Sequence, residues 1–313
     1  MLLTLWTMPQ AANSNLELKL MIEKGEFAPN EPVPVQYMLR NRSAVAQPYP
    51  GDVGPNSDWI KFEVGSGALQ PYRTGGVACR FIQNRTLAPG EALRAQVLMI
   101  SNQHSRGRGI GQTALIPFMP FSTAGKYEIE ARYPLGSDDP NEALGSNVLQ
   151  VVVRKANEKE RSALGFFDSP DALSLALGGE SSGATPSQPR SLEASVESWE
   201  RFVEAFGDTA YGPYVRLNLA RTYMLDQGLK TKRPDLAATH LRAVIASGPK
   251  AIVDDALLDL AKAEIAEGQT TEAQDATARL LKDFPNSEFV PEARRISEGL
   301  KAGRHTMQDI LSN

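Results

Sequence analysis

The side chains in this sequence that could take part in catalysis or metal binding are few and widely separated. There are three histidines, His104, His240 and His305, and a single cysteine, Cys79. None of the four has another histidine or cysteine within four residues, the close spacing that zinc sites use. A nucleophilic cysteine also needs a base beside it, and no histidine is near Cys79 in sequence. We therefore expect solvated or partly packed histidines and a buried, inert thiol, with no catalytic residue and no metal site.

The glycine-rich and carboxylate-rich segments do not predict chemistry either. The basic loop 101–111 lies between two expected strands, whereas a phosphate-binding loop joins a strand to a helix. We expect a hairpin loop there, which could contact an acidic partner. The acidic runs 52–58 and 138–142 lack EF-hand spacing, so solvated loops are expected, with a calcium site as the alternative. Because nucleophile-elbow and His-Glu-x-x-His motifs are absent, we predict a protein that is not an enzyme and needs no cofactor.

The composition is that of an ordinary two-domain protein. The 313 residues, 42% hydrophobic and 22% charged, suffice for two domains that each bury a core. Residues 1–155 carry 15 basic and 13 acidic side chains, and residues 156–313 carry 18 and 24. Neither half has the basic stripe of a nucleic-acid-binding protein, so no nucleic-acid partner is expected. A single cysteine excludes an intramolecular disulfide, which suits the cytosol and the bacterial envelope equally.

Residues 14–155 have the pattern of a β domain. Alternating or continuously apolar runs, as in strands, occur at 16–22, 33–39, 60–64, 77–82, 93–100, 127–133 and 148–153. Two turns between them share one design, Ala28-Pro29-Asn30-Glu31 and Ala88-Pro89-Gly90-Glu91. Proline sets φ at the first central position, and Asn or Gly tolerates the positive φ that follows.

This β segment resembles the immunoglobulin-like domains of many bacterial extracytoplasmic proteins. The resemblance rests on the Pro-Gly-Glu turn before an alternating strand and on Gly125-Lys126-Tyr127, where a Gly-x-Tyr strand closes the sandwich. Tyr127 is placed like the tyrosine corner of such sandwiches. The resemblance implies an all-β immunoglobulin-like sandwich over 14–155 and implies little about function.

Beyond residue 155 the pattern becomes helical. Two short helices are expected within 156–190, a segment that ends in a polar, flexible linker at 178–190. Over 191–303 apolar residues recur at helical spacing between glycines that can end helices and prolines that can begin them. The expected helices are 191–206, 213–227, 234–247, 252–267, 270–283 and 290–302. Residues 304–313 are expected to be a C-terminal tail, and residues 1–13 a disordered leader or a signal-peptide remnant.

The helical segment repeats itself and resembles tetratricopeptide (TPR) repeats over 191–303. Residues 217–221, Leu-Asn-Leu-Ala-Arg, recur 41 residues later as Leu-Asp-Leu-Ala-Lys at 258–262. The Phe-Pro-Asn-Ser phrase at 284–287 is most similar to repeats of bacterial envelope proteins, such as the Tol–Pal-associated periplasmic coordinator and outer-membrane assembly lipoproteins. The Trp, Leu, Gly and Tyr signature is incomplete in each repeat, and no cysteine lies near the N-terminus to carry a lipid.

Together the two resemblances imply an all-β immunoglobulin-like sandwich followed by all-α TPR-like repeats, with a protein or peptide as partner. In such repeats the first helix of each pair lines the binding groove. Arg216, Asn218, Arg221 and Lys262 are therefore the candidate partner-binding residues. For each of them an ordinary polar helix surface is the alternative.

The expected function is a non-enzymatic scaffold or adaptor in the bacterial cell envelope, periplasmic or secreted, with the cytoplasm as the other open compartment. The alternative is an accessory or proteinase-inhibitor-like module that acts through the β-sandwich. No segment has the length of a membrane span, so no integral membrane segment is expected. The sequence leaves open the partner's identity, the oligomeric state and the rigidity of the linker.

Overall fold

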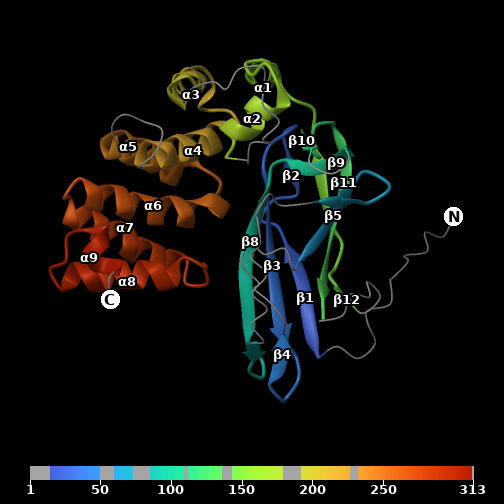
Figure 1. Cartoon of the computed structure of the whole chain (residues 1–313), viewed down its shortest axis with the longest axis horizontal. Helices are drawn as coiled ribbons and strands as arrows, with labels where there is room; N and C mark the ends of the chain where they lie inside the picture. The colour runs from blue at the N-terminus through green and yellow to red at the C-terminus, as the bar shows by residue number, and fades with distance from the viewer. Residues whose placement is uncertain are drawn as a thin grey trace.

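In the computed structural model, a β region and a helical region lie side by side (Figure 1). The structure describes residues 15–49, 60–72, 85–108, 112–135, 143–178, 192–225 and 232–311. The strands are β1 (Leu16–Met21), β2 (Glu26–Phe27), β3 (Val33–Asn41), β4 (Gln47–Tyr49), β5 (Lys61–Gly65), β6 (Gln70–Tyr72), β7 (Arg85–Leu87), β8 (Ala92–Met99), β9 (Asn102–Arg108), β10 (Gln112–Phe118), β11 (Gly125–Pro134), β12 (Ala143–Gly145) and β13 (Leu149–Val153).

Two sheets of the β region pack against each other around one apolar core. One has the strand order β1-β3-β8 and the other β2-β13-β11-β5-β6, with β12 beside β11. Side chains of β5 alternate between buried and more exposed, the period of two that the sequence predicted for these strands. Across the core, the rings of Tyr37 and Phe62 meet edge to face with their centroids 5.9 Å apart. The expected all-β region is thus confirmed.

The two similar turns have the geometry that their sequence predicts. Asn30 and Gly90 have φ of 59° and 76°. In each turn the glutamate carboxylate accepts a hydrogen bond from the main-chain N–H three residues earlier, at 2.8 Å for Glu31 and 2.7 Å for Glu91. This hydrogen bond closes each turn just before a long strand begins.

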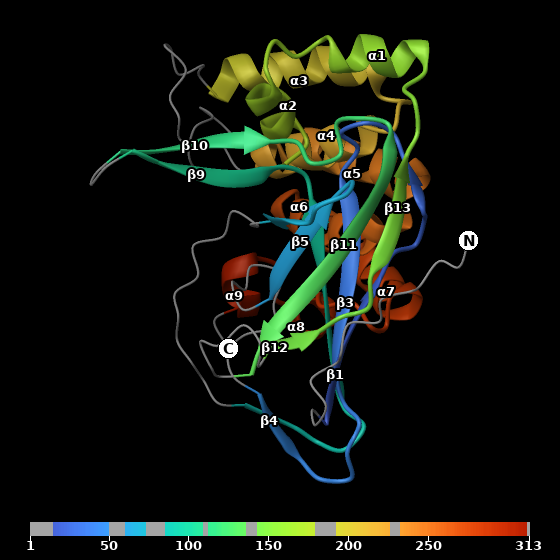
Figure 2. The ribbon, with the colours of Figure 1, turned by 90° about the vertical axis from the view of Figure 1, so that its right-hand side faces the viewer.

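The segment expected to be a loop at 101–111 is largely strand. Here β9 pairs antiparallel with β10, and the resulting hairpin projects from the rest of the β region (Figure 2). Several other expectations lie outside the described residues: the leader, the strand at 77–82 with Cys79, the acidic loops and most of the linker.

The helical region follows the expected helices closely. Its helices are α1 (Glu158–Leu164), α2 (Pro170–Ala176), α3 (Leu192–Phe206), α4 (Gly212–Met224), α5 (Pro234–Ser247), the 3-10 turn Lys250–Ile252, α6 (Val253–Ala266), α7 (Thr270–Asp283), α8 (Val290–Lys301) and α9 (Met307–Leu311).

The predicted C-terminal tail contains a packed helix, which corrects the expectation for 304–313. Ile310 of α9 is 3% exposed. It sits so close to Gly299 of α8 that a Cβ there would lie 2.8 Å from its Cγ1. The helix was missed because five residues are too few to show a periodic pattern in the sequence.

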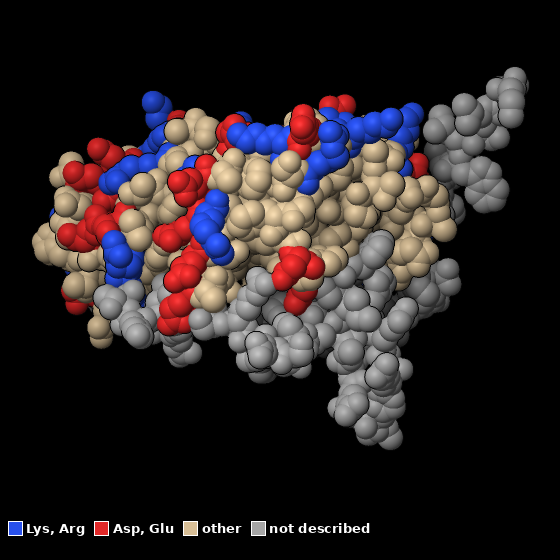
Figure 3. Space-filling model, turned by 90° about the horizontal axis from the view of Figure 1, so that it is seen from above, with Lys and Arg blue, Asp and Glu red and all other residues tan. Residues whose placement is uncertain are grey.

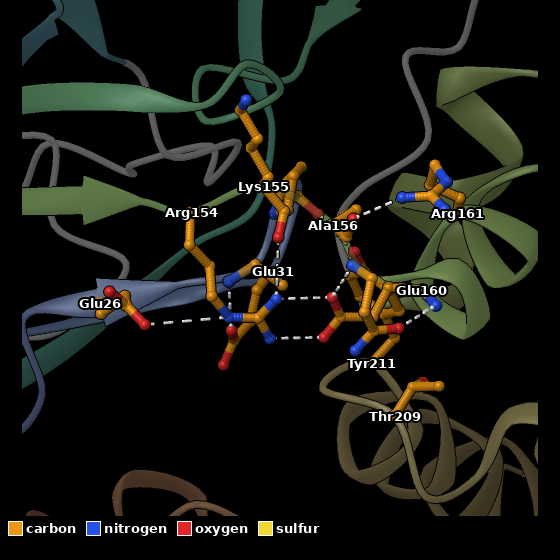
Figure 4. Close-up of polar contacts among 12 residues, drawn as sticks. Glu26, Glu31, Arg154, Lys155, Ala156, Glu160, Arg161, Thr209 and Tyr211 are labelled. Carbon is orange, nitrogen blue, oxygen red and sulfur yellow. Dashed lines mark hydrogen bonds and ion pairs between the residues drawn. The ribbon is translucent and has the colours of Figure 1, made fainter.

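The two regions share a hydrophobic core at the junction between them. Ala28, Ile100 and Met119 of the β region belong to the same buried cluster as side chains of α2 to α6. Beside it, the Arg154 guanidinium bonds both carboxylate oxygens of Glu160, at 2.6 and 2.5 Å (Figure 4).

Candidate functional site

A cavity of about 640 Å³ lies between the β region and the helices. Its walls are the β1-β3-β8 sheet on one side, and α4, the start of α6 and the α7–α8 turn on the other. We call it the interdomain cavity. Its volume falls within the range of about 300–1,000 Å³ that is usual for ligand pockets.

Two side chains of β8 reach across from the sheet to the helices. Nε2 of Gln96 donates to the carbonyl of Ala251 at 2.7 Å. Nη1 of Arg94 donates to Oδ1 of Asn286 at 3.4 Å, in an exposed and therefore weak contact. At the junction the two regions share an apolar core. At the start of α6 and at the α7–α8 turn, these two polar contacts connect β8 with the helices.

Three carboxylates on the helical wall have raised pKa values. Burial, together with the charges of Asp255 and Asp254, raises the pKa of Glu288 to about 7. Burial raises the pKa of Asp255 to about 6 although the charge of Arg221 opposes it, and burial also raises the pKa of Asp254. Among the described residues only Asp255 of the three has an ion pair, with Arg221, so a cationic group could still be bound by Asp254 and Glu288.

An ion-pair ladder crosses α4, α6 and α8 next to the cavity. Arg221 pairs with Asp255 and, through Nε at 2.8 Å, with Asp259. Lys262 lies 4.0 Å from Asp259 and 3.1 Å from Glu292. Burial alone would lower the pKa of Arg221, but the two aspartates outweigh it and hold that pKa above its usual value. The ladder cross-links the repeated helices.

The four predicted partner-binding residues occupy different places. Arg221 lines the interdomain cavity, and Lys262 belongs to the ladder. The amide of Asn218 donates to the carbonyl of Leu175 at the end of α2, at 2.8 Å. Arg216 lies instead beside the α3–α4 turn, where burial lowers its pKa. Partner binding by these residues stays a prediction, and the structure brings only Arg221 to the cavity wall.

Apart from Arg221, sequence reasoning did not select the residues that shape this cavity. Gln96 and Glu288 gave no signal, and they lie 192 residues apart in the chain. Only packing of the two regions brings them together.

The structure describes the side chains of His240 and His305, whereas that of His104 lies outside the described part. The ring of His240 stacks on Tyr223 at 6.0 Å between centroids, and burial lowers its pKa. His305 is exposed. Among the described residues, no group of three or more His, Cys, Asp or Glu is arranged to hold a metal ion. Within the same residues, every helix is too short or too polar to cross a membrane.

Charge on the face shown in Figure 3 is mixed. Lys and Arg side chains are interspersed with Asp and Glu over its described part.

Comparison with known proteins identifies one repeat. Residues 255–287, which span most of α6 and all of α7, match the tetratricopeptide repeat family. No curated protein matches the chain. The helical region therefore contains a TPR, as the sequence resemblance implied, and TPR arrays are typical protein-binding modules.

Solved structures resemble the chain only distantly. A multi-domain immunophilin from Arabidopsis thaliana is 12% identical with a TM-score of 0.29, over 78% of this chain and 93% of that one. Spo0M, a sporulation control protein from Bacillus subtilis, is 11% identical with a TM-score of 0.26, over 49% and 55%. A Listeria innocua beta-glucosidase in complex with isofagomine is 14% identical with a TM-score of 0.26, and the match spans 45% of this chain and 16% of that chain.

Proposed function

We propose that this protein is a non-enzymatic scaffold or adaptor that binds a protein partner at the interdomain cavity. The observation that carries the proposal is the position of the cavity, which is walled by the repeated helices α4 and α6 and by the α7–α8 turn. The TPR match covers two of these elements. Helical repeats of this kind offer one helix of each pair to a partner.

Two finer parts of the proposal concern the β region and the compartment. We infer an immunoglobulin-like sandwich, supported by the parallel pairing of β2 with β13 at the edge of the second sheet. The hydroxyl of Tyr127 donates to the carbonyl of Thr123 at 2.8 Å, as a tyrosine corner would. The bacterial cell envelope is proposed as the compartment on the sequence resemblance alone.

The test is affinity capture with the full chain, because the shared core makes separate domains unsuitable as baits. Asn286→Trp places a bulky ring at the exposed rim of the cavity, and Gln269→Trp places the same ring on the exposed α6–α7 turn. We expect a specific protein to be retained by the parent and by Gln269→Trp, and lost with Asn286→Trp. Equal retention by both variants would move the binding site away from the cavity.

The alternative, a proteinase-inhibitor-like module, is supported by the projecting β9–β10 hairpin (Figure 2). An inhibitor of this kind would slow a panel of purified proteases at stoichiometric concentration, and replacing residues 109–111 by Gly-Ser-Gly would abolish the effect. A scaffold would leave all protease rates unchanged.

A further inference from the structure

The β8 strand presents an unused hydrogen-bonding edge to the interdomain cavity. In the described part of the chain β8 pairs with β3 alone. The N–H of Asn41, the last residue of β3, donates to the carbonyl of Glu91 just before β8, at 3.0 Å. Main-chain groups alternate in direction along an antiparallel strand, so in this register Ala95 and Val97 bond to β3, and the main-chain groups of Arg94, Gln96 and Leu98 point away from it.

These outward groups have no main-chain partner among the described residues. Arg94, Gln96 and Leu98 all line the cavity. An unpaired strand edge is a template for another strand, and proteins normally cover or charge such edges. Here the edge lies inside a cavity that has room for a short peptide segment.

The wall opposite this edge is acidic. Asp254, Asp255 and Glu288 line it, and of the three only Asp255 has an ion pair, with Arg221, among the described residues. The Glu288 carboxylate is near enough to the Gln96 N–H for that group to lower its pKa, so it lies beside the edge of β8. A strand added to β8 would therefore place a side chain next to the Glu288 carboxylate.

We propose that the interdomain cavity binds an extended peptide segment, which adds as a strand to the free edge of β8 and places a basic side chain on Glu288, Asp254 and Asp255. The inference rests on the proposed function and specifies its partner chemistry. Main-chain pairing supplies affinity, and the acidic wall selects a lysine or arginine at one position of the peptide.

The experiment measures binding of fluorescein-labelled short peptides to the full chain by fluorescence anisotropy. The basic probe alternates Thr or Val with Lys, and a matched probe carries Glu in place of each Lys. A third probe is the basic peptide with alternate main-chain nitrogens methylated, which cannot pair as a strand. We expect the basic probe to bind at least about tenfold more tightly than either of the others.

Two variants of Arg94 separate the contribution of the β8 main chain to binding from that of the Arg94 charge. Arg94→Ala removes a positive side chain from the cavity and should leave the affinity for the basic probe unchanged or increased. Arg94→Pro removes the same charge and also the outward N–H, and should weaken binding by about tenfold or more. Proline is tolerated at such an edge position because the ladder to β3 does not use this N–H. If Arg94→Pro fails to fold by circular dichroism, the methylated probe tests the same hydrogen bonds on the parent protein.

Each result has a definite meaning. Equal affinity for the basic and methylated probes, or for Arg94→Ala and folded Arg94→Pro, would overturn strand addition. Equal affinity for the basic and acidic probes would overturn the choice of a basic side chain. If no probe binds while Asn286→Trp still releases a captured partner, the peptide inference is wrong and the scaffold function stands. If no probe binds and Asn286→Trp also retains the captured partner, both the peptide inference and the proposed function are wrong.

Discussion

Tyr211 and Tyr214 connect the helices to the β region through single hydroxyl groups. Both side chains are buried, and their hydroxyls donate to the carbonyls of Pro29 at 2.7 Å and Pro32 at 3.3 Å. Burial raises the pKa of each phenol above its usual value, so both remain neutral donors over the physiological range. Each bond therefore joins the start of α4 to the turn before β3 irrespective of pH.

Tyr211→Phe should lower the free energy of unfolding by about 1–2 kcal/mol, because it leaves a buried carbonyl without its donor. Tyr214→Phe should cost less, since its hydrogen bond is the longer of the two. Urea unfolding followed by tryptophan fluorescence measures both. A larger loss for Tyr214→Phe than for Tyr211→Phe would contradict this ranking.

Glu288→Gln should change how stability depends on pH. The folded pKa of about 7 lies above the ordinary value of 4.5, so the folded state holds the proton more tightly than the unfolded state. The associated stability is present below about pH 4.5 and is lost as pH rises through 7. The free energy of unfolding of the variant should therefore exceed that of the parent by about 1–2 kcal/mol at pH 8, and this difference should disappear near pH 4.

Chemical denaturation at both pH values measures this difference. Glu298→Gln is the matched control, because Glu298 is exposed on the neighbouring helix α8. An advantage of Glu288→Gln that is the same at pH 4 and pH 8 would mean that the carboxylate is not penalised by its surroundings.

At the scale of elements, the turn between α3 and α4 depends on two glycines. A Cβ on Gly212 would lie 2.2 Å from the carbonyl oxygen of Gly207, a main-chain atom that cannot move aside without shifting the turn. Tyr211 lies in this turn, so the close approach of the two glycines also positions the hydroxyl that donates to Pro29 of the β region. The sequence shows both glycines but not that they touch.

Gly212→Ala should destabilise the protein by about 1–3 kcal/mol through this steric conflict. Gly67→Ala is the control, because a Cβ there meets nothing within 4 Å. Thermal unfolding by circular dichroism compares the two. A neutral Gly212→Ala would show that the turn can relax without cost.

The C-terminal ends of several helices could be predicted from glycines in the sequence. Gly268 and Gly303 end α6 and α8 with φ of 76° and 77°, the left-handed geometry for which glycine is suited. Gly248 ends α5 differently, with φ of −75°, and is required because a Cβ would lie 2.6 Å from the carbonyl oxygen of Val244. The position of a helix end was thus predictable, while its mechanism depended on packing.

At the scale of the whole molecule, the shared core joins the two regions into one structural unit. Ala28, Ile100 and Met119 are all less than 9% exposed and pack with side chains of the helices. A chain cut after residue 155 would expose this apolar surface to water.

We expect residues 15–155 expressed alone to bind a hydrophobic dye and to self-associate, whereas the full chain does neither. Dye fluorescence and size-exclusion chromatography measure these properties. A fragment that is monomeric, binds no dye and unfolds cooperatively would show that the β region is independent of the helices.

The order of the two regions, most strands and helices, and a TPR within the helical region could be predicted from the sequence alone. These features follow from periodicity and from turn residues, which act over a few positions along the chain. The sequence also selected Arg221, which lines the cavity, but partner binding by Arg221 stays a prediction. The length of the β9–β10 hairpin and the packing of α9 were not foreseen.

The location of the candidate site follows from the packing of the two regions. The Gln96 N–H and the Glu288 carboxylate lie near each other because the α7–α8 turn is beside β8, the edge strand of its sheet. The shifted pKa of Glu288 likewise comes from burial and from neighbours supplied by α6. Such contacts depend on how two regions dock, and no local pattern in either region encodes them.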